Sequence, residues 1–405
     1  MMSGNWKTKQ LGDICDIQLG KTPSRKNKQL WDEDKITQNV WLSVADLKNT
    51  DGKFVHDSKE YVSFEGKGFC KPVKQGTLLV SFKLTLGRLA IAGRELYTNE
   101  AIAALSINDE MMISKEYLYY YLHYFDWDAA AVGKEKVKGK TLNKAILKTL
   151  EIRFPPLGEQ QRIVSILDEA FPQISVSQKR ATANVAAAEE LFSSSLYNTI
   201  TIVKPNWLES TIDQLAEHRL GKMLDKNKNT GSLRPYLRNK NVRWFGFDLT
   251  DVNEMKFEDS ERSKYTAIAG DLLICEGGYP GRAAIWNDTE PVYFQKALHR
   301  VRFNEKNHTK WFLYYLYYLD LTEGLRKHFT GTGIQHFTGK SLAKMSIPIA
   351  PSGEIDSKIM MLEQFHSEVK KLTQLNDDKM AHLTKLKHSL LLEAFSGKLT
   401  GGIAA

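Results

Sequence analysis

The sequence predicts a mixed α/β protein in which one module occurs twice and each copy is followed by a long helix. The chain of 405 residues, 42% of them hydrophobic, is long enough to form two domains of ordinary size. Short motifs of the first half return in the second half. Each half also closes with a proline-bearing stretch and then an apolar stripe at helical spacing.

The repeat is visible as pairs of matching residues at a nearly constant separation. Asn5-Trp6 matches Asn206-Trp207, a shift of 207 − 6 = 201 positions. Further matching pairs, at similar shifts, are Gly20-Lys21 with Gly221-Lys222, Gly87-Arg88 with Gly281-Arg282, Gly139-Lys140 with Gly339-Lys340, and Gly158-Glu159 with Gly353-Glu354. Because the motifs keep their order while the separations vary, we expect two copies of one fold whose surface loops have diverged. Such loops are where binding specificity normally lies.

Each module is predicted to contain a sheet and an aromatic-rich helix. Residues 77–82 and 88–92 are short apolar runs of strand-forming residues. In the second copy, the glycine-rich loop EGGYPGR (276–282) predicts a sharp turn or a close approach to a ligand. Residues 117–125 and 311–319 are apolar on nearly every face, which predicts a mostly buried helix; a base-stacking platform is the alternative.

A long spacer helix is predicted to begin at Gly158 and another at Gly353. The first apolar stripe consists of Ile163, Leu167, Ala170, Ile174, Ala181, Val185, Ala188 and Phe192. The second follows alternating steps of three and four, typical of a coiled-coil seam: Leu362, Phe365, Val369, Leu372, Asn376, Lys379, Leu383, Leu386 and Leu390. We expect the two stripes to pair antiparallel about a pseudo-two-fold axis, with Asn376 and Lys379 fixing the register.

The predicted helices are long enough to act as a spacer. At a rise of ~1.5 Å per residue, about 40 helical residues form a rod of roughly 60 Å. One turn of duplex DNA is ~34 Å long, so such a rod could hold two modules more than one turn apart. The apolar tail from Leu390 to Leu399 exceeds what a solvated helix needs. We therefore expect this tail and the outer helix faces to contact partner proteins.

Charge and cysteine content narrow the class of protein further. The formal net charge of +8 is consistent with a polyanionic partner, although many enzymes share such a charge. Cys15, Cys70 and Cys275 are far apart, so neither a disulfide scaffold nor a thiolate zinc site is expected. The sequence has neither a run of about 18 apolar residues nor a recognisable secretory signal, so we expect a cytoplasmic protein without membrane contact.

No catalytic motif accounts for the repeat. A DNA adenine methyltransferase needs Asn or Asp before Pro-Pro-aromatic, whereas Pro155-Pro156 is followed by leucine. A phosphate-binding loop is narrowly missed, because five residues instead of four separate Gly333 from Gly339, and Gly133 from Gly139. The ten histidines show no HExxH pattern. Triplets such as Glu65-Gly66-Lys67 are common by chance, so nuclease chemistry is not predicted either.

Loops rich in basic and amide side chains are the candidate nucleic-acid contacts, since such groups pair with phosphates or with base edges. In the first module these candidates are Lys21, Thr22, Ser24, Arg25, Lys26, Lys28, Arg88, Lys134, Lys136, Lys138 and Lys140. In the second module they are Lys222, Lys226, Arg238, Lys240, Arg243, Arg282, Gln335, His336 and Lys340. For any one of them, an ordinary solvated surface residue is the alternative.

Several stretches resemble the specificity subunits of type I restriction-modification systems. They are GKTPSRKN (20–27), WLSVADL (41–47), RFPPLGEQQRIVSILD (153–168) and LKHSLLLEAFSGKL (386–399). The PPLGEQQ form is the most specific of them. The second copy departs from this pattern, with GKMLD at 221–225 and PSGEID at 351–356.

The resemblance implies a division of the chain into four segments. They are a first target-recognition domain (1–157), a central spacer helix (158–203), a second target-recognition domain (204–352) and a C-terminal spacer helix (353–405). Each domain is expected to read one half of a bipartite, asymmetric target in double-stranded DNA. The paired helices are expected to set the gap between the halves.

The resemblance also implies partners and cofactors. The spacer helices would dock two modification (methyltransferase) subunits, and restriction subunits (ATP-dependent nucleases and translocases) would join the complex. S-adenosylmethionine, ATP and Mg²⁺ would be bound by these partners, while this chain would bind no metal or cofactor and catalyse no reaction. From the residues alone, a non-catalytic coiled-coil interaction scaffold with incidental basic charge is the alternative.

Overall fold

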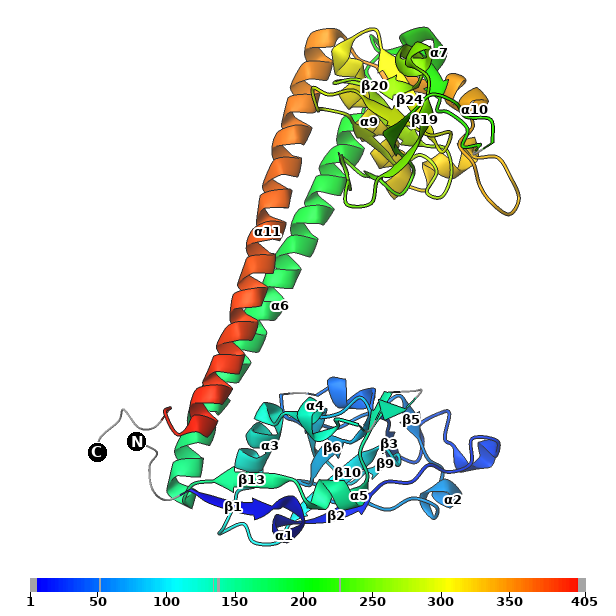
Figure 1. Ribbon diagram of the computed structural model, residues 1–405. Coiled ribbons are helices and arrows are strands. Elements are labelled where there is room, and N and C mark those ends of the chain that lie inside the picture. Colours follow the sequence, from blue (N-terminus) through cyan, green and yellow to red (C-terminus); the bar gives the residue numbers. More distant parts are fainter. Residues whose placement is uncertain (1–5, 51, 134, 137–138, 226, 400–405) are drawn as a thin grey trace. The chain divides into compact units, whose positions relative to one another are not determined.

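The computed structural model describes residues 6–50, 52–133, 135–136, 139–225 and 227–399 (Figure 1). The chain forms two compact units: unit 1 comprises Met1–Ala181 and Asp377–Ala405, and unit 2 comprises Thr182–Asn376. Two long helices, α6 (Leu157–Thr201) and α11 (Ser352–Ser396), each contribute one part to either unit. Each unit is therefore an α/β module together with parts of both long helices.

Unit 1 is built around a five-stranded sheet, ordered β2 (Cys15–Leu19), β10 (Ile102–Ile107), β6 (Leu78–Ser81), β8 (Leu89–Ala92) and β4 (Phe54–Val55). A smaller sheet has the order β5 (Glu60–Tyr61), β3 (Val40–Leu42) and β9 (Tyr97–Thr98). Another has the order β11 (Glu135–Lys136), β12 (Gly139–Thr141) and β7 (Lys83–Leu84). In addition, β1 (Lys7–Gln10) pairs with β13 (Glu151–Phe154). The helices are α1 (Leu11–Ile14), α2 (Phe64–Lys67), α3 (Lys115–Tyr124), α4 (Trp127–Ala130) and α5 (Lys144–Lys148), with 3₁₀ turns η1 (Lys28–Leu30) and η2 (Asp46–Lys48).

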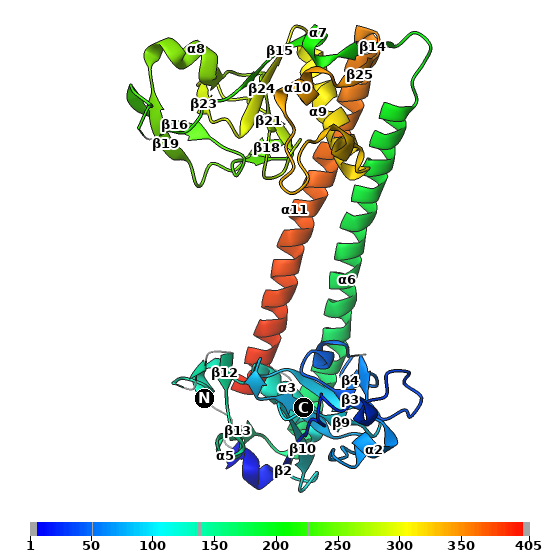
Figure 2. The same cartoon turned by 90° about the vertical axis from the view of Figure 1, so that its right-hand side faces the viewer.

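Unit 2 repeats this plan around the order β15 (Ala216–Leu220), β24 (Leu298–Phe303), β21 (Leu272–Cys275) and β22 (Ala283–Ile285) (Figure 2). A smaller sheet has the order β19 (Asn253–Phe257), β16 (Ser232–Leu237), β23 (Val292–Phe294) and β20 (Thr266–Ala267). In addition, β17 (Val242–Arg243) pairs with β18 (Gly246–Phe247), and β14 (Leu208–Thr211) pairs with β25 (Ser346–Ile349). The helices are α7 (Ile212–Leu215), α8 (Arg262–Tyr265), α9 (Lys306–Leu321) and α10 (Gly339–Ala343), with 3₁₀ turns η3 (Asp259–Glu261) and η4 (Gly324–His328).

The internal repeat is confirmed by matching hydrogen bonds. The backbone N–H of Gly20 donates to Ile102 at 3.2 Å, and that of Gly221 donates to Leu298 at 3.0 Å. A Cβ atom at Gly20 would lie 2.2 Å from the carbonyl oxygen of Asn99, and one at Gly221 would meet a neighbouring carbonyl oxygen at 2.3 Å. The glycine is repeated because the backbones approach too closely for a side chain.

The predicted strands and aromatic helices are confirmed. The runs 77–82 and 88–92 contain β6 and β8, which are buried along their whole length. Alternate residues of β6 enter two hydrophobic clusters: Leu78 faces the helices, and Leu79 faces the smaller sheet that carries β3. Each module thus has three layers, and a strand buried on both faces explains the uninterrupted apolar run. Helices α3 and α9 are mostly buried, as predicted.

The junction between module and helix explains the PPLGEQQ motif. The long helices begin at Leu157 and Ser352, one residue before the predicted positions. The fully buried side chain of Gln160 donates to the carbonyl oxygens of Met112 and Pro155 and accepts the backbone N–H of Ser114. All its polar atoms are therefore satisfied within the core.

The antiparallel pairing of the helices is confirmed inside each unit. In unit 1, Ile163 near the start of α6 shares a core with Ala394 near the end of α11. In unit 2, Ile200 near the end of α6 shares a core with Ile355 near the start of α11. All eight predicted stripe residues of α6 are buried or half-buried.

The predicted seam of α11 is wrong at two positions. Lys379 and Leu386 are exposed, while Met380 and Lys387 are half-buried in their place. A stripe with strict 3.5-residue spacing drifts by about 20° per heptad on an undistorted helix, so the buried face moves on by one residue. Asn376 does not fix the register through the facing helix, because its amide donates to Leu372 of its own helix at 3.0 Å.

The C-terminal tail packs within unit 1. Leu391, Ala394 and Phe395 are buried in its core, and the Phe395 ring lies 5.5 Å from Tyr117 and 5.3 Å from Tyr121, centroid to centroid. The apolar character of the tail is thus explained by contacts with α3. The expectation that these buried side chains present a surface to partner proteins was wrong.

Candidate nucleic-acid interface

A four-residue turn follows β3 in unit 1 and is named turn 1 (43–46). The Asp46 carboxylate accepts the backbone N–H of Ser43 at 2.8 Å, and the Asp46 N–H donates to the Ser43 carbonyl at 3.1 Å. These two bonds close the turn from both ends. Its third residue, Ala45, is exposed.

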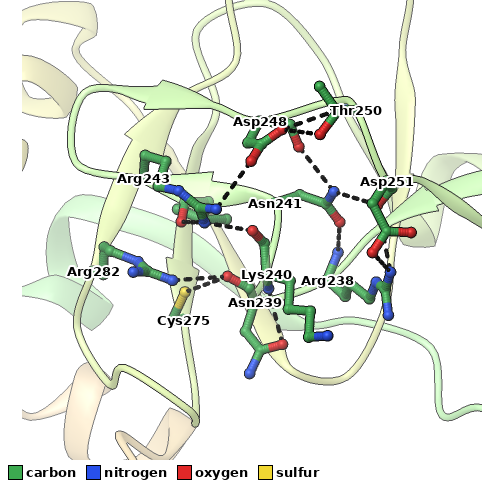
Figure 3. Close-up of polar contacts among 11 residues, drawn as sticks. Arg238, Asn239, Lys240, Asn241, Arg243, Asp248, Thr250, Asp251, Cys275 and Arg282 are labelled. Carbon is green, nitrogen blue, oxygen red and sulfur yellow. Dashed lines mark hydrogen bonds and ion pairs between the residues drawn. The ribbon is translucent and has the colours of Figure 1, made fainter. Parts of the chain in front are cut away.

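The same structure follows β16 in unit 2 and is named turn 2 (238–241; Figure 3). The Asn241 side-chain oxygen accepts the backbone N–H of Arg238 at 3.0 Å, and the Asn241 N–H donates to the Arg238 carbonyl at 2.8 Å. The Asn241 amide also donates to the carbonyl oxygens of Asp248 and Asp251, each at 2.9 Å. Asn241 is almost fully buried, so this network holds the turn and the loop after it together.

The repeated Gly-Arg motif clamps both turns. A guanidinium N–H of Arg88 donates to the carbonyl oxygen of Val44 at 3.0 Å, and one of Arg282 donates to that of Asn239 at 3.0 Å. The Arg282 guanidinium also lies over the ring of Tyr279. The structure therefore places Arg88 and Arg282 behind the turns as supports.

In unit 2, three candidate loops meet. The Asn239 amide of turn 2 donates to the carbonyl oxygen of Gly277 in the glycine-rich loop at 3.0 Å. The Glu276 carboxylate of that loop lies 3.1 Å from Nδ1 of His336. His336 also pairs with Thr330 across a bridge that closes the segment carrying the exposed Gln335.

The cationic side chains around turn 2 differ in whether they form ion pairs. Arg238 forms an ion pair with Asp251 at 2.6 Å, and Arg243 forms one with Asp248 at 3.0 Å (Figure 3). Lys240 is exposed, and among the described residues its ammonium has no hydrogen-bond or ion-pair partner. A recess of about 380 Å³ lies beside it, lined by Lys240, Asn241, Arg243, Asp248, Asp251 and Arg282.

Three candidates of unit 2 remain: Lys222, Lys340 and Lys226. Lys222 is only 8% exposed; its ammonium is ion-paired with Glu261, donates to the Lys256 carbonyl at 3.1 Å and lies over the Phe257 ring. Its charge is therefore compensated inside the module. Lys340 is exposed on α10, and Lys226 lies outside the described residues.

In unit 1, Arg25 anchors the loop that precedes η1. Its guanidinium makes a two-bond ion pair with Glu60 and lies 4.0 Å from the centroid of Trp31 and 4.7 Å from that of Trp41. This arrangement orients the loop that carries the exposed Lys21, Ser24, Lys26 and Lys28. A recess of about 380 Å³ lies here, lined in part by Arg25, Lys28 and Trp31.

Near this loop, the Glu100 carboxylate interacts with the Thr22 hydroxyl and with nearby cationic side chains. Glu100 accepts a hydrogen bond from the Thr22 hydroxyl. Burial acts to raise the pKa of Glu100, but this hydrogen bond and the nearby Lys83 and Arg25 charges lower it overall. Strand pairing also brings the lysine-rich β11–β12 hairpin beside β7, with Lys140 opposite Leu84. Lys136 lies in β11, whereas Lys134 and Lys138 fall outside the described residues.

Sequence reasoning missed an exposed cation of unit 2, Lys296. It occupies the position of Glu100, since the Asn99 N–H donates to Leu42 at 2.9 Å and the Gln295 N–H donates to Leu237 at 2.9 Å. The signal was available, because Asn-Glu-Ala at 99–101 aligns with Gln-Lys-Ala at 295–297. The charge is reversed between the two copies at this position.

The described residues contain no cluster of three or more His, Cys, Asp or Glu side chains that could hold a metal ion. Within the same residues, no helix combines the length and apolarity needed to cross a membrane. The site instead gathers cations, amides and aromatic rings on loops held by a rigid scaffold. Such groups bind phosphates and base edges.

Comparisons with known proteins agree with this arrangement. Residues 3–183 and 204–378 match the family model described as type I restriction modification DNA specificity domain. The type I restriction enzyme MjaIX specificity subunit of Methanocaldococcus jannaschii is 24% identical over 426 residues, which cover 98% of this chain and 94% of that protein.

Two solved structures share the fold. One, described as the structural basis of complex assembly and conformational transition of the type I restriction-modification system, has a TM-score of 0.74 at 18% identity and covers 98% of this chain and 99% of its own. The other is the HsdS subunit from Thermoanaerobacter tengcongensis, with a TM-score of 0.56 at 17% identity and 98% coverage of both chains.

Proposed function

Because the chain belongs to the family of DNA specificity subunits of type I restriction-modification systems, we propose that each of its two modules reads one half of a bipartite DNA target through its own turn and neighbouring loops. The chain is a non-catalytic DNA-recognition component of such a complex, which it forms with methyltransferase and restriction subunits. A scaffold with incidental basic charge is therefore set aside.

One observation carries the proposal: the same clamped turn occurs in both modules with different side chains on it. Turn 1 carries Ser43 and Ala45 where turn 2 carries Arg238 and Lys240, while the hydrogen bonds that close the two turns are equivalent. A shared scaffold with unlike exposed groups is suited to reading two unlike half-sites. The result would be an asymmetric target.

The proposal assigns roles to the predicted segments. Residues 1–157 and 204–352 are the two target-recognition domains, and the helices at 158–203 and 353–405 set the gap in the target. The proposed DNA contacts are the exposed candidates that form no ion pair among the described residues: Lys21, Ser24, Lys26 and Lys28 in the first domain, and Lys240, Gln335, Lys340 and the additional Lys296 in the second. Arg25, Arg88, Arg238, Arg243 and Arg282 act mainly by holding the loops, and Lys222 belongs to the core.

The proposed partners follow from this role. Two modification subunits would dock on outward faces of the helices, and restriction subunits would complete the complex on double-stranded DNA. S-adenosylmethionine, ATP and Mg²⁺ would serve the partner subunits and not this chain. The protein would act in the cytoplasm, where its DNA target is.

A domain exchange tests the proposal. Replacing residues 1–150 with the equivalent segment of another specificity subunit should change one half of the methylated motif, because the loops of the first domain are replaced. The second half and the gap should stay unchanged, because unit 2 and the helices are retained. Single-molecule sequencing of genomic DNA from cells that express the chain with its modification subunits reports the motif.

The control is the reciprocal exchange of 204–352, which should change the other half only. Changes in both halves after one exchange would show that the domains are not separate readers. If deletion of the gene for this chain removed no bipartite motif from the methylome, the DNA-reading role itself would fail.

A further inference from the structure

The two turns differ in what their third residue presents. In turn 1 this residue is Ala45 and in turn 2 it is Lys240, and both are exposed. The residue before it is held from behind by the repeated arginine through its carbonyl oxygen. The third position is therefore the outward-facing point of a turn whose backbone is the same in both copies.

We infer that the third position of each turn is a base-reading position, and that Lys240 donates hydrogen bonds to acceptor atoms on the edge of one base pair in the second half-site. This inference rests on the proposed function and names one residue that determines specificity within it. The expected acceptors are O6 and N7 of guanine, which lysine contacts in the major groove.

The backbone under Lys240 is held by hydrogen bonds on both sides of the turn. Turn 2 is closed by the two bonds between Arg238 and Asn241, and Asn241 ties it to the following loop. The Arg282 clamp and the bond from the Asn239 amide to Gly277 hold it from the other side. Base readout depends on such fixed placement, whereas phosphate contacts serve mainly to position the protein.

The two arginines beside Lys240 form ion pairs, whereas the Lys240 ammonium has no ion-pair partner among the described residues. Arg238 and Arg243 are neutralised by Asp251 and Asp248. The recess of about 380 Å³ beside Lys240 offers both donors and carboxylate acceptors, the chemical mixture found on a base-pair edge. A site meant only for phosphate would not gather two carboxylates beside its cation.

The chemistry of turn 1 fits the same role with a different base. Ala45 has a methyl side chain and no hydrogen-bonding group, and apolar contact of this kind suits the C5-methyl group of thymine. The two halves would then require different bases at equivalent positions. An identical turn would allow this difference through a single side chain.

The test uses the complete complex with its modification subunits. Lys240→Ala should relax one base pair of the second half-site, with discrimination there falling about tenfold or more, while the first half-site and the gap persist. Lys240→Arg should retain a guanine preference, since both side chains donate to the same acceptors. Ala45→Lys should change the preference at one position of the first half-site only. Methylation across the genome, and competition binding with duplexes that differ by one base pair, report these outcomes.

The matched control is Lys256→Ala, which removes the same charge from an exposed position on β19 outside the recess. This variant should leave the motif unchanged. If Lys240→Ala keeps the wild-type motif and only binds every sequence more weakly, Lys240 is a phosphate contact and the inference is overturned. That result would leave the proposed function intact, whereas a wild-type chain without any bipartite motif would overturn the proposed function instead.

Discussion

At the residue scale, the arginines that repeat in both modules are supports for the turns. Arg88 and Arg282 each use one guanidinium N–H to hold the carbonyl oxygen of the second turn residue. A guanidinium can make this bond and also lie over an aromatic ring, as Arg282 does over Tyr279. Lysine cannot reproduce both contacts, because its ammonium is a compact point charge.

Arg282→Lys is expected to weaken reading of the second half-site without removing a charge. Loss of the guanidinium hydrogen bond should cost about 1.5–3 kcal/mol at the turn, since hydrogen bonds to charged groups have this magnitude. Discrimination at the second half-site should fall about tenfold, and the first half-site should be unaffected. Competition binding of the assembled complex with half-site variants measures both. Arg234→Lys is the control, because that side chain is half exposed and pairs only loosely with Asp259 at 3.8 Å; an equal effect of both changes would contradict the clamp.

At the element scale, the ends of α11 belong to different cores. The last turns pack on α3 in unit 1, and the first turns pack on α9 and the end of α6 in unit 2. In unit 1, Lys387 lies over the ring of Phe171 on α6, and burial lowers its pKa. The long helices are therefore structural parts of both modules.

Phe395→Ala is expected to destabilise unit 1. The Phe395 ring is 4% exposed and contacts three tyrosines of α3, so its removal should cost about 3–5 kcal/mol. Amide hydrogen exchange of α3 and of the last turns of α11 should accelerate, while exchange in unit 2 should not change. Leu392→Ala is the matched control on the same helix, since Leu392 is 47% exposed and its removal should have little effect. Equal acceleration in both variants would show that the tail is not part of the core.

At the scale of the whole molecule, unit 1 is assembled from both ends of the chain. It combines Met1–Ala181 with Asp377–Ala405, so its core cannot be completed before the last helix has been made. Bringing these distant segments together costs conformational entropy. This cost is compensated only when α6 and α11 pack together in the core. Truncation after Gly353 would therefore remove nearly all of α11 and, with it, part of the core of unit 1.

The length of α6 is expected to set the gap in the DNA target. Four residues inserted between Ser177 and Ala181 lengthen the helix by slightly more than one turn, ~6 Å. One turn nearly preserves the apolar stripe and corresponds to one or two base-pair steps of ~3.4 Å. The gap in the methylated motif should therefore grow by one or two base pairs while both half-sites persist. Substitution of Ser177 and Lys179 by alanine, without a change in length, is the control; an unchanged gap in an active insertion variant would refute the spacer role.

The sequence predicted the helices and strands of the scaffold better than the residues of the site. The strands at 77–82 and 88–92, the aromatic helices and the two long helices follow from local apolar patterns, and the structure has all of them. The α11 seam was misplaced at Lys379 because the assumed spacing ignored the drift of a regular helix. Among the site residues, the sequence located the basic loops but could not separate Lys222, which is buried, from Lys240, which is exposed.

The sequence by itself determined the repeat, the order of the elements and the family, because these depend on residue types at short separations along the chain. Only the tertiary structure decided which cations are available. Arg25, Arg243 and Arg282 look alike in sequence, yet each is engaged by a group that the chain brings from elsewhere or from a nearby turn. Hydrogen bonds and ion pairs depend on distances of about 3 Å between atoms that folding brings together, and local residue patterns carry no information on those distances.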